Sequence, residues 1–193
     1  MYKFYFLASL LILQGCKGQN AGQEFYSQEF DWKIIIPAGF EKMDDQEAEK
    51  LQRKGLDAIE NTYQTEIENR SKKIALYKSG QLNFIEANYQ SFDPETDGSY
   101  NDANKIVKEA LYQTYEAQMK GLKIDTASSR ETISGKEFEK FTMKVKFPND
   151  MTLHTIMYNR LFGKWEFTFN IVYMDEEKGD EMIAAWRNSV FLR

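Results

Sequence analysis

The sequence is poor in the residues that most often build reactive centres. It holds one cysteine, Cys16, and one histidine, His154, among 193 residues. With no second cysteine, no disulfide can form within the chain, so the hydrophobic core must stabilise the fold. A single histidine with no cysteine or second histidine to join it argues against a zinc site and against a hydrolase triad. We therefore expect His154 to be structural, with its imidazole held by polar neighbours.

Several motifs with a known mechanism are missing as well. The chain has no G-x-S-x-G turn, no phosphate-binding glycine loop and no dinucleotide fingerprint. Acidic pairs such as Glu137 with Glu139 could serve acid–base catalysis, but 30 acidic residues produce such pairs by chance. The acidic run from Asp175 to Glu177 is better placed to favour the start of a helix. We expect no enzymatic activity, no cofactor and no metal.

Charge and composition limit the remaining classes of protein. The formal net charge is −5, and charges of both signs are interspersed along the chain. An acidic protein without a basic patch is a poor ligand for a phosphate backbone, so we expect no nucleic-acid partner. An apolar content of 42% and an aromatic content of 15% are enough for one domain with a packed core.

The first residues read as an export signal. Lys3 precedes a short apolar run, Phe4 to Leu13, which is shorter than the roughly 20 residues needed to span a bilayer. The following Leu13-Gln14-Gly15-Cys16 resembles the lipobox of bacterial lipoproteins. That resemblance implies a signal peptide over residues 1–15, cleavage before Cys16, and lipidation of Cys16. Lipidation would also account for a single unpaired thiol in an exported chain.

The resemblance further implies a location. A lipid on Cys16 would hold the chain in the cell envelope, and Lys17, where an aspartate would signal inner-membrane retention, favours the outer membrane. Residues 16–24 are polar and contain glycine, which predicts a flexible lipidated tether. The alternative is an ordinary secretory signal followed by an incidental cysteine.

Alternation of apolar and polar residues predicts a three-stranded antiparallel meander from Glu137 to Tyr173. Its middle strand, Met151 to Leu161, is apolar on both faces, as a central strand covered on each side requires. Earlier in the chain we predict a strand at Phe30–Ile36, a hairpin with strands at 74–78 and 82–89, and a strand at 124–133.

Helices are predicted at 45–63, at 102–121 and at the C-terminus. Asp44 and Glu47 have capping-box spacing at the start of the first helix. Gly55 lies inside that helix at a cost of about 1 kcal/mol relative to alanine, which hints at close packing on the sheet. The C-terminal helix would bury the stripe Met182, Ile183, Trp186 and Val190. Together the elements predict an α+β fold, a mainly antiparallel twisted sheet with helices on both faces.

This arrangement resembles the PsbP-like superfamily, which includes the photosystem II extrinsic protein, the Ran guanine-nucleotide-release factor and the DcrB-like lipoproteins. The resemblance rests on four features: Phe30–Phe40 (FDWKIIIPAGF), Ile133–Phe138 (ISGKEF), the hairpin at Gly163, and the closing helix with Trp186 and Ser189. It covers residues 25–193 as one PsbP-like domain, an α/β/α sandwich, whereas the acidic stretch 91–101 has no counterpart. Members share a scaffold and no common chemistry.

One stretch could bind a cation. Asp93, Glu95 and Asp97 occupy positions 1, 3 and 5 of a calcium-type loop, with Gly98 at position 6. Position 12 falls on Asn104, which lacks the bidentate carboxylate of such loops. We keep these three acids as calcium candidates, against the alternative of a solvated acidic loop.

The sequence leaves three functions open. The first is a non-enzymatic, lipid-anchored envelope protein that binds a protein partner or assists an envelope complex. The second is a carrier of a small ligand or lipid, with an apolar pocket between the sheet and a helix. The third and least favoured is an envelope hydrolase, because no nucleophile and base can be named.

Overall fold

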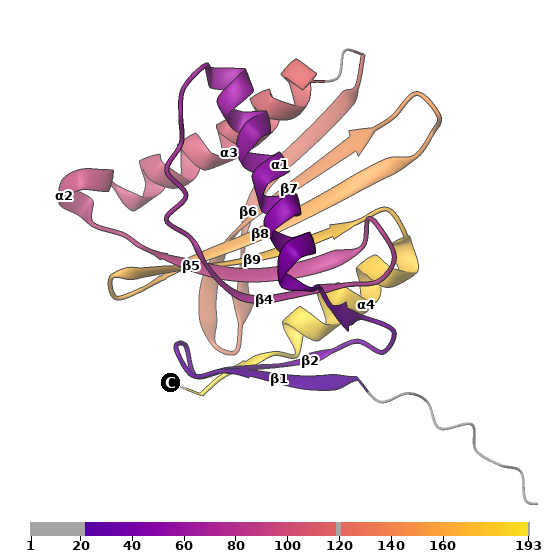
Figure 1. Cartoon of the computed structure of the whole chain (residues 1–193). Helices are drawn as coiled ribbons and strands as arrows, with labels where there is room; N and C mark the ends of the chain where they lie inside the picture. The colour runs from indigo at the N-terminus through magenta and orange to yellow at the C-terminus, as the bar shows by residue number, and fades with distance from the viewer. Residues whose placement is uncertain (1–21, 119–120, 193) are drawn as a thin grey trace, which may run out of the picture.

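The structure is a computed structural model that describes residues 22–118 and 121–192. Two antiparallel sheets and three long helices build it (Figure 1). The main sheet has the strand order β3-β4-β5-β9-β8-β7-β6, and the small sheet has the order β1-β2-β10. In the described part of the chain, no helix is long and apolar enough to cross a membrane.

The main sheet contains the predicted meander as its centre. Strands β7, β8 and β9 pair in sequence order, and β8 is buried on both faces from Leu153 to Asn159. The seven strands of the main sheet are β3 (Glu41–Lys42), β4 (Lys72–Lys78), β5 (Phe84–Ser91), β6 (Lys123–Ile133), β7 (Lys136–Lys146), β8 (Thr152–Phe162) and β9 (Trp165–Tyr173). The prediction of a mainly antiparallel sheet is confirmed.

Helices cover both faces of the main sheet, as expected (Figure 1). One face packs against α4 (Glu176–Arg187) and the small sheet, which consists of β1 (Gln23–Ser27), β2 (Trp32–Ile36) and β10 (Val190–Phe191). The other face carries α1 (Asp45–Tyr63) and α3 (Tyr100–Gln118), and the short α2 (Pro94–Asp97) precedes α3.

The core under α4 is aromatic. The rings of Trp186 and Phe169 stack with their centroids 4.3 Å apart, and Trp32 lies edge-on to Phe169 at 5.6 Å. Both tryptophans are completely buried. Offset-stacked and edge-to-face pairs of this kind add to the area that the rings bury, so they hold α4 and the small sheet on the main sheet.

Three details differ from the sequence-based expectations. The strand that begins near Phe30 joins the small sheet instead of the main sheet, because β1 and β10 pair with it. Strand β1 starts at Gln23, so the last two residues of the predicted tether at 16–24 are part of a strand. Val190 lies on β10 with its side chain exposed, so it is not part of the buried stripe of α4.

Candidate binding surface on helices α1 and α3

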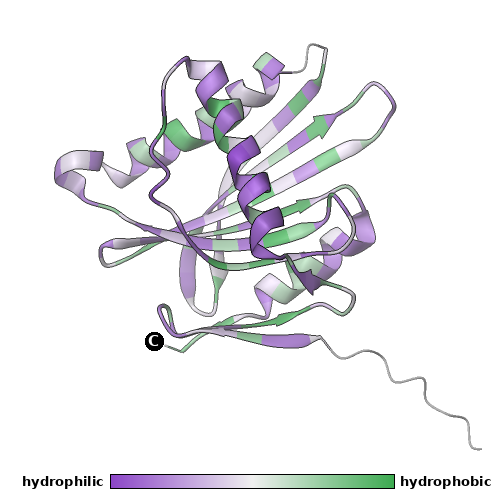
Figure 2. Cartoon of the chain, viewed as in Figure 1, coloured by the Kyte–Doolittle hydropathy of each residue, from purple (hydrophilic) through white to green (hydrophobic). Residues whose placement is uncertain are grey.

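Helix α1 forms as its sequence predicts but barely touches the sheet. Its N-cap residue Asp44 accepts a hydrogen bond from the backbone N–H of Glu47 at 2.9 Å. Ala48 is its only buried residue, and it packs with Met43 and Leu76 at the start of the helix. Figure 2 shows α1 as hydrophilic along most of its length. The helix therefore leaves the sheet after its first turns.

The expected close packing at Gly55 is wrong. A Cβ atom at this position would meet nothing within 4 Å, so no neighbour requires the glycine. The glycine that does allow close packing is Gly179 on α4, where a Cβ would lie 2.5 Å from the ring of Tyr173. In the sequence, both positions are simply glycines within a helix. Only the tertiary packing shows that Gly179 has a close neighbour and Gly55 has none.

A largely apolar groove lies between α1 and α3. Its volume is about 320 Å³. The residues that line it are Ile59, Tyr63, Ile67, Ile106, Glu109, Ala110 and Gln113. The hydroxyl of Tyr63 donates to the side-chain oxygen of Gln113 at 2.7 Å, which joins the two helices at one end of the groove.

Large apolar side chains around this groove are open to solvent. Ile106 is 67% exposed, Val107 46% and Tyr63 41%. Single exposed apolar residues are common on protein surfaces, but a group of them beside an apolar groove makes this surface a candidate for binding. We call the groove together with Tyr63, Ile106 and Val107 the α1–α3 face.

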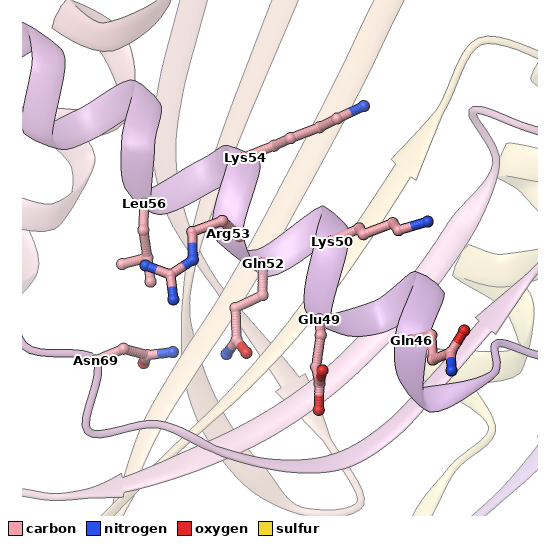
Figure 3. Close-up of a pocket in the computed structure, with 8 residues that line it drawn as sticks. All are labelled: Gln46, Glu49, Lys50, Gln52, Arg53, Lys54, Leu56 and Asn69. Atoms are coloured by element: carbon pink, nitrogen blue, oxygen red, sulfur yellow. The ribbon is translucent and has the colours of Figure 1, made fainter.

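A second, polar pocket of about 740 Å³ lies along α1 (Figure 3). Figure 3 shows the labelled side chains of α1 together with Asn69 from the segment before β4. Lys50, Arg53 and Lys54 contribute positive charge, Glu49 negative charge, and Leu56 is the one apolar side chain in the lining. Such a lining suits solvated contacts at the border of an interface better than an apolar ligand.

Beneath α1 and α3, the central strands turn polar side chains toward the helices. Asn170 on β9 donates to Glu86 on β5 at 3.3 Å, and Gln90 donates to Glu166 at 2.8 Å. Asn159 on β8 donates to the hydroxyl of Thr168 at 3.0 Å. An apolar cluster of β7 and β8 packs against Leu111 and Tyr115 of α3, so these amides and carboxylates border only the part of the space next to that cluster.

Tyr100 and Asn104 on α3 extend this polar layer. Asn104 is 4% exposed, and in the described structure neither its amide nitrogen nor its oxygen has a hydrogen-bond partner. The hydroxyl of Tyr100 also lacks a hydrogen-bond partner of good geometry. Burial, with the negative charge of Glu166 added, raises the pKa of Tyr100 well above its ordinary value, so the phenol stays protonated. Sequence patterns missed this cluster, because its members come from separate elements.

Two of the three calcium candidates, Asp93 and Asp97, have side chains used in local contacts. Asp93 caps α2 by accepting from the backbone N–H of Glu95 at 3.0 Å, and Asp97 pairs with Arg70 at 2.8 Å. The hydrogen bond from the Asp93 backbone and that from Arg70 lower the pKa of Asp97. Within residues 22–118 and 121–192, no three His, Cys, Asp or Glu side chains are grouped so as to hold a metal ion. The structure thus places these acids in a capped turn.

His154 has the structural surroundings expected of it. Its ring stacks on Tyr173 with centroids 4.6 Å apart, and its Nε2 lies 3.1 Å from a carboxylate oxygen of Glu176. Burial lowers its pKa, which the Glu176 carboxylate opposes and Lys144 reinforces. The sequence alone does not show these two contacts, because strand register brings Tyr173 to His154 and the start of α4 brings Glu176 there.

The other residues singled out from the sequence do not meet as a catalytic group. Glu137 and Glu139 both pair with the guanidinium of Arg130, at 3.2 and 2.8 Å. Asp175 caps α4 by accepting from the backbone N–H groups of Glu177 and Lys178, as predicted. Cys16 lies outside the described residues.

Comparison with known proteins identifies the fold. No protein-family model and no curated protein sequence matches this chain. The solution structure of the cyanobacterial PsbP protein CyanoP from Synechocystis matches 89% of this chain and 94% of its own, with a TM-score of 0.54 and 10% identity. LpqN of Mycobacterium tuberculosis, described as involved in cell envelope biogenesis, matches 90% of this chain and 86% of its own, with a TM-score of 0.45 and 9% identity. The likeness to CyanoP shows that the chain has a PsbP-like fold.

Proposed function

We propose that this chain is a non-enzymatic accessory protein of the cell envelope, anchored by a lipid on Cys16, and that its α1–α3 face binds a protein partner. The observation that carries the proposal is the exposed apolar surface on α3, with Ile106 67% open to solvent beside an apolar groove. Ile106 and Val107 interrupt an otherwise polar solvent side of α3 next to the groove, and a bound partner would remove both side chains from water.

The shape of the groove favours an amphipathic helix as the bound element. Ile59 and Tyr63 on α1, and Ile106, Ala110 and Gln113 on α3, recur at helical spacings of three and four residues. Two helices that present such rows form a trough, and a third helix can lay its apolar face in it. The charged residues of the neighbouring polar pocket would then contact the border of that helix.

The carrier alternative receives less support. An acyl chain needs an apolar pocket between sheet and helix. In the described structure, the strands beneath α1 present Glu86, Asn88 and Asn170 there, and these polar groups would lose hydrogen bonds with water if a lipid filled the space. The lining therefore disfavours a lipid at this position.

Photo-crosslinking in the native envelope tests the partner. A benzophenone amino acid replaces Ile106 in one variant and Leu82 in the control. Leu82 is 47% exposed in the turn between β4 and β5. We expect a specific adduct from position 106 that is absent from position 82. The same adducts from both positions, or none, would contradict the proposal.

Membrane fractionation tests the lipid anchor. Cys16→Ser should release the protein from the membrane fraction, and retention there would refute the anchor.

A further inference from the structure

The exposed apolar residues of the described chain fall into two main groups. Four of the ten large ones belong to the α1–α3 layer, namely Leu51, Tyr63, Ile106 and Val107. Another four lie on or next to the small sheet: Tyr26 is 46% exposed, Ile35 49%, Val190 42% and Leu192 61%. The main sheet stands between the two groups (Figure 1).

The second group shares one face of the small sheet. Tyr26 and Val190 both lie opposite Lys33 in the strand register, and Ile35 lies opposite Glu24. The alternate residues of β2 and β10, such as Trp32, Ile34 and Phe191, are buried against the main sheet. Because side chains alternate along a strand, Tyr26, Ile35, Val190 and Leu192 must point outward. We call these four the outer face.

An ion pair and a hydrogen bond lie on or beside the outer face. Lys33 pairs with Glu24 at 2.5 Å, and the hydroxyl of Tyr26 donates to Asp31 at 2.5 Å. Paired charges cost less to bring near an apolar medium than unpaired ones. Tyrosine, with an apolar ring and a polar end, is a residue favoured at the boundary between lipid headgroups and water.

The chain brings this face close to the predicted anchor. Strand β1 starts at Gln23, seven residues after Cys16. Seven residues span at most about 25 Å when fully extended. A lipid on Cys16 would therefore keep the small sheet within about 25 Å of the headgroups, whereas α1 and α3 lie on the far side of the main sheet.

We propose that the outer face lies on the membrane surface, with Tyr26, Ile35, Val190 and Leu192 at the headgroup boundary. The α1–α3 face then points away from the bilayer toward its partner. This orientation rests on the proposed lipidation of Cys16. It assigns the two apolar surfaces to different occupants, the bilayer and the protein partner.

Spin labelling of the full lipidated protein tests the orientation. Cys16 is the only cysteine, and thioether lipidation consumes its thiol, so an introduced cysteine is the one site that a nitroxide reagent can label. Ile35→Cys reports on the outer face, and Ile106→Cys is the matched control on the α1–α3 face, since both residues are exposed isoleucines. Each protein is bound to vesicles of phosphatidylethanolamine and phosphatidylglycerol, and collisions with oxygen and with a water-soluble nickel chelate are measured.

We expect the label at position 35 to be protected from the nickel chelate and open to oxygen when vesicles are present, and the label at position 106 to be equally open to nickel with and without vesicles. If position 35 stays open to nickel on vesicle-bound protein, the orientation is overturned while the anchor stands. Mass spectrometry of the same sample reports the acyl chains. Their absence overturns the anchor, and the orientation with it.

Discussion

Two helical glycines offer a direct test of the packing derived above. Gly55 lies on the exposed part of α1, and Gly179 lies on α4 against Tyr173. The same substitution, glycine to alanine, removes the same backbone freedom at both sites, which favours the helix by about 0.5–1 kcal/mol. At Gly55 nothing opposes this gain, so Gly55→Ala should stabilise the protein by that amount.

At Gly179 the added methyl group meets a ring that cannot easily move. A Cβ there would lie 2.5 Å from Cδ2 and Cε2 of Tyr173, and that ring is itself stacked on His154. Overpacking a core in this way costs about 1–3 kcal/mol. Gly179→Ala should therefore destabilise the protein by about 1 kcal/mol after the helical gain is subtracted.

The difference between the two variants isolates the packing cost. A difference of about 2 kcal/mol corresponds to about 4–8 °C in melting temperature for a chain of this size. Thermal and urea unfolding followed by circular dichroism measure it. In a Tyr173→Leu background the penalty of Gly179→Ala should shrink, because a smaller side chain leaves room for the methyl group. If Gly179→Ala stabilises as much as Gly55→Ala, the close approach of α4 to β9 is refuted.

Three further predictions concern charge and the core. Burial lowers the pKa of His154 in the folded state, so the unfolded chain binds a proton first as the pH drops below about 6.5. The wild type should therefore lose more stability between pH 7 and 5 than His154→Gln. Free energies of unfolding from urea titrations that fall equally with pH in both proteins would contradict this. Burial favours a raised pKa at Glu131, but hydrogen bonds from Arg187 and Lys140 outweigh it and lower the pKa. Arg187→Met should cost about 0.5–1 kcal/mol at pH 7, since the guanidinium is half exposed. This cost should shrink as the pH falls below the ordinary glutamate pKa and through the lowered folded pKa, and a cost that does not change with pH would contradict the ion pair. Trp186→Ala should cost about 3–5 kcal/mol in chemical unfolding, and a cost below about 1 kcal/mol would show that α4 is not held by its aromatic packing.

Local sequence patterns identified most elements with close bounds. Helix α1 begins and ends where capping and periodicity placed it, and β7, β8 and β9 follow the alternation between Glu137 and Tyr173. Such signals depend on residues near one another in the chain, which is why they can be read without a structure. The α+β class followed from them, because strands joined by short turns must pair antiparallel.

Long-range placement could not be read in the same way. The strand after Phe30 alternates like any strand, and only the pairing with β1 and β10 assigns it to the small sheet. His154 acquired Tyr173 through strand register and Glu176 through the start of α4. The polar layer of Tyr100, Asn104 and Glu166 joins a helix to a strand more than sixty residues away. Local sequence patterns do not predict such long-range contacts.

By itself, the sequence determined that the chain carries a lipobox-like Leu13–Cys16, that its core must hold without disulfides, and that runs of strands joined by short turns indicate an α+β domain. These features depend on composition, period and short spacings. The tertiary structure alone decided that α1 stays clear of the sheet, that Gly179 and not Gly55 marks close packing, and that exposed apolar residues gather on opposite sides of the main sheet. These three features depend on which surfaces pack together. Burial of apolar surface contributes free energy only where segments distant in the chain come into contact, so local sequence cannot specify it.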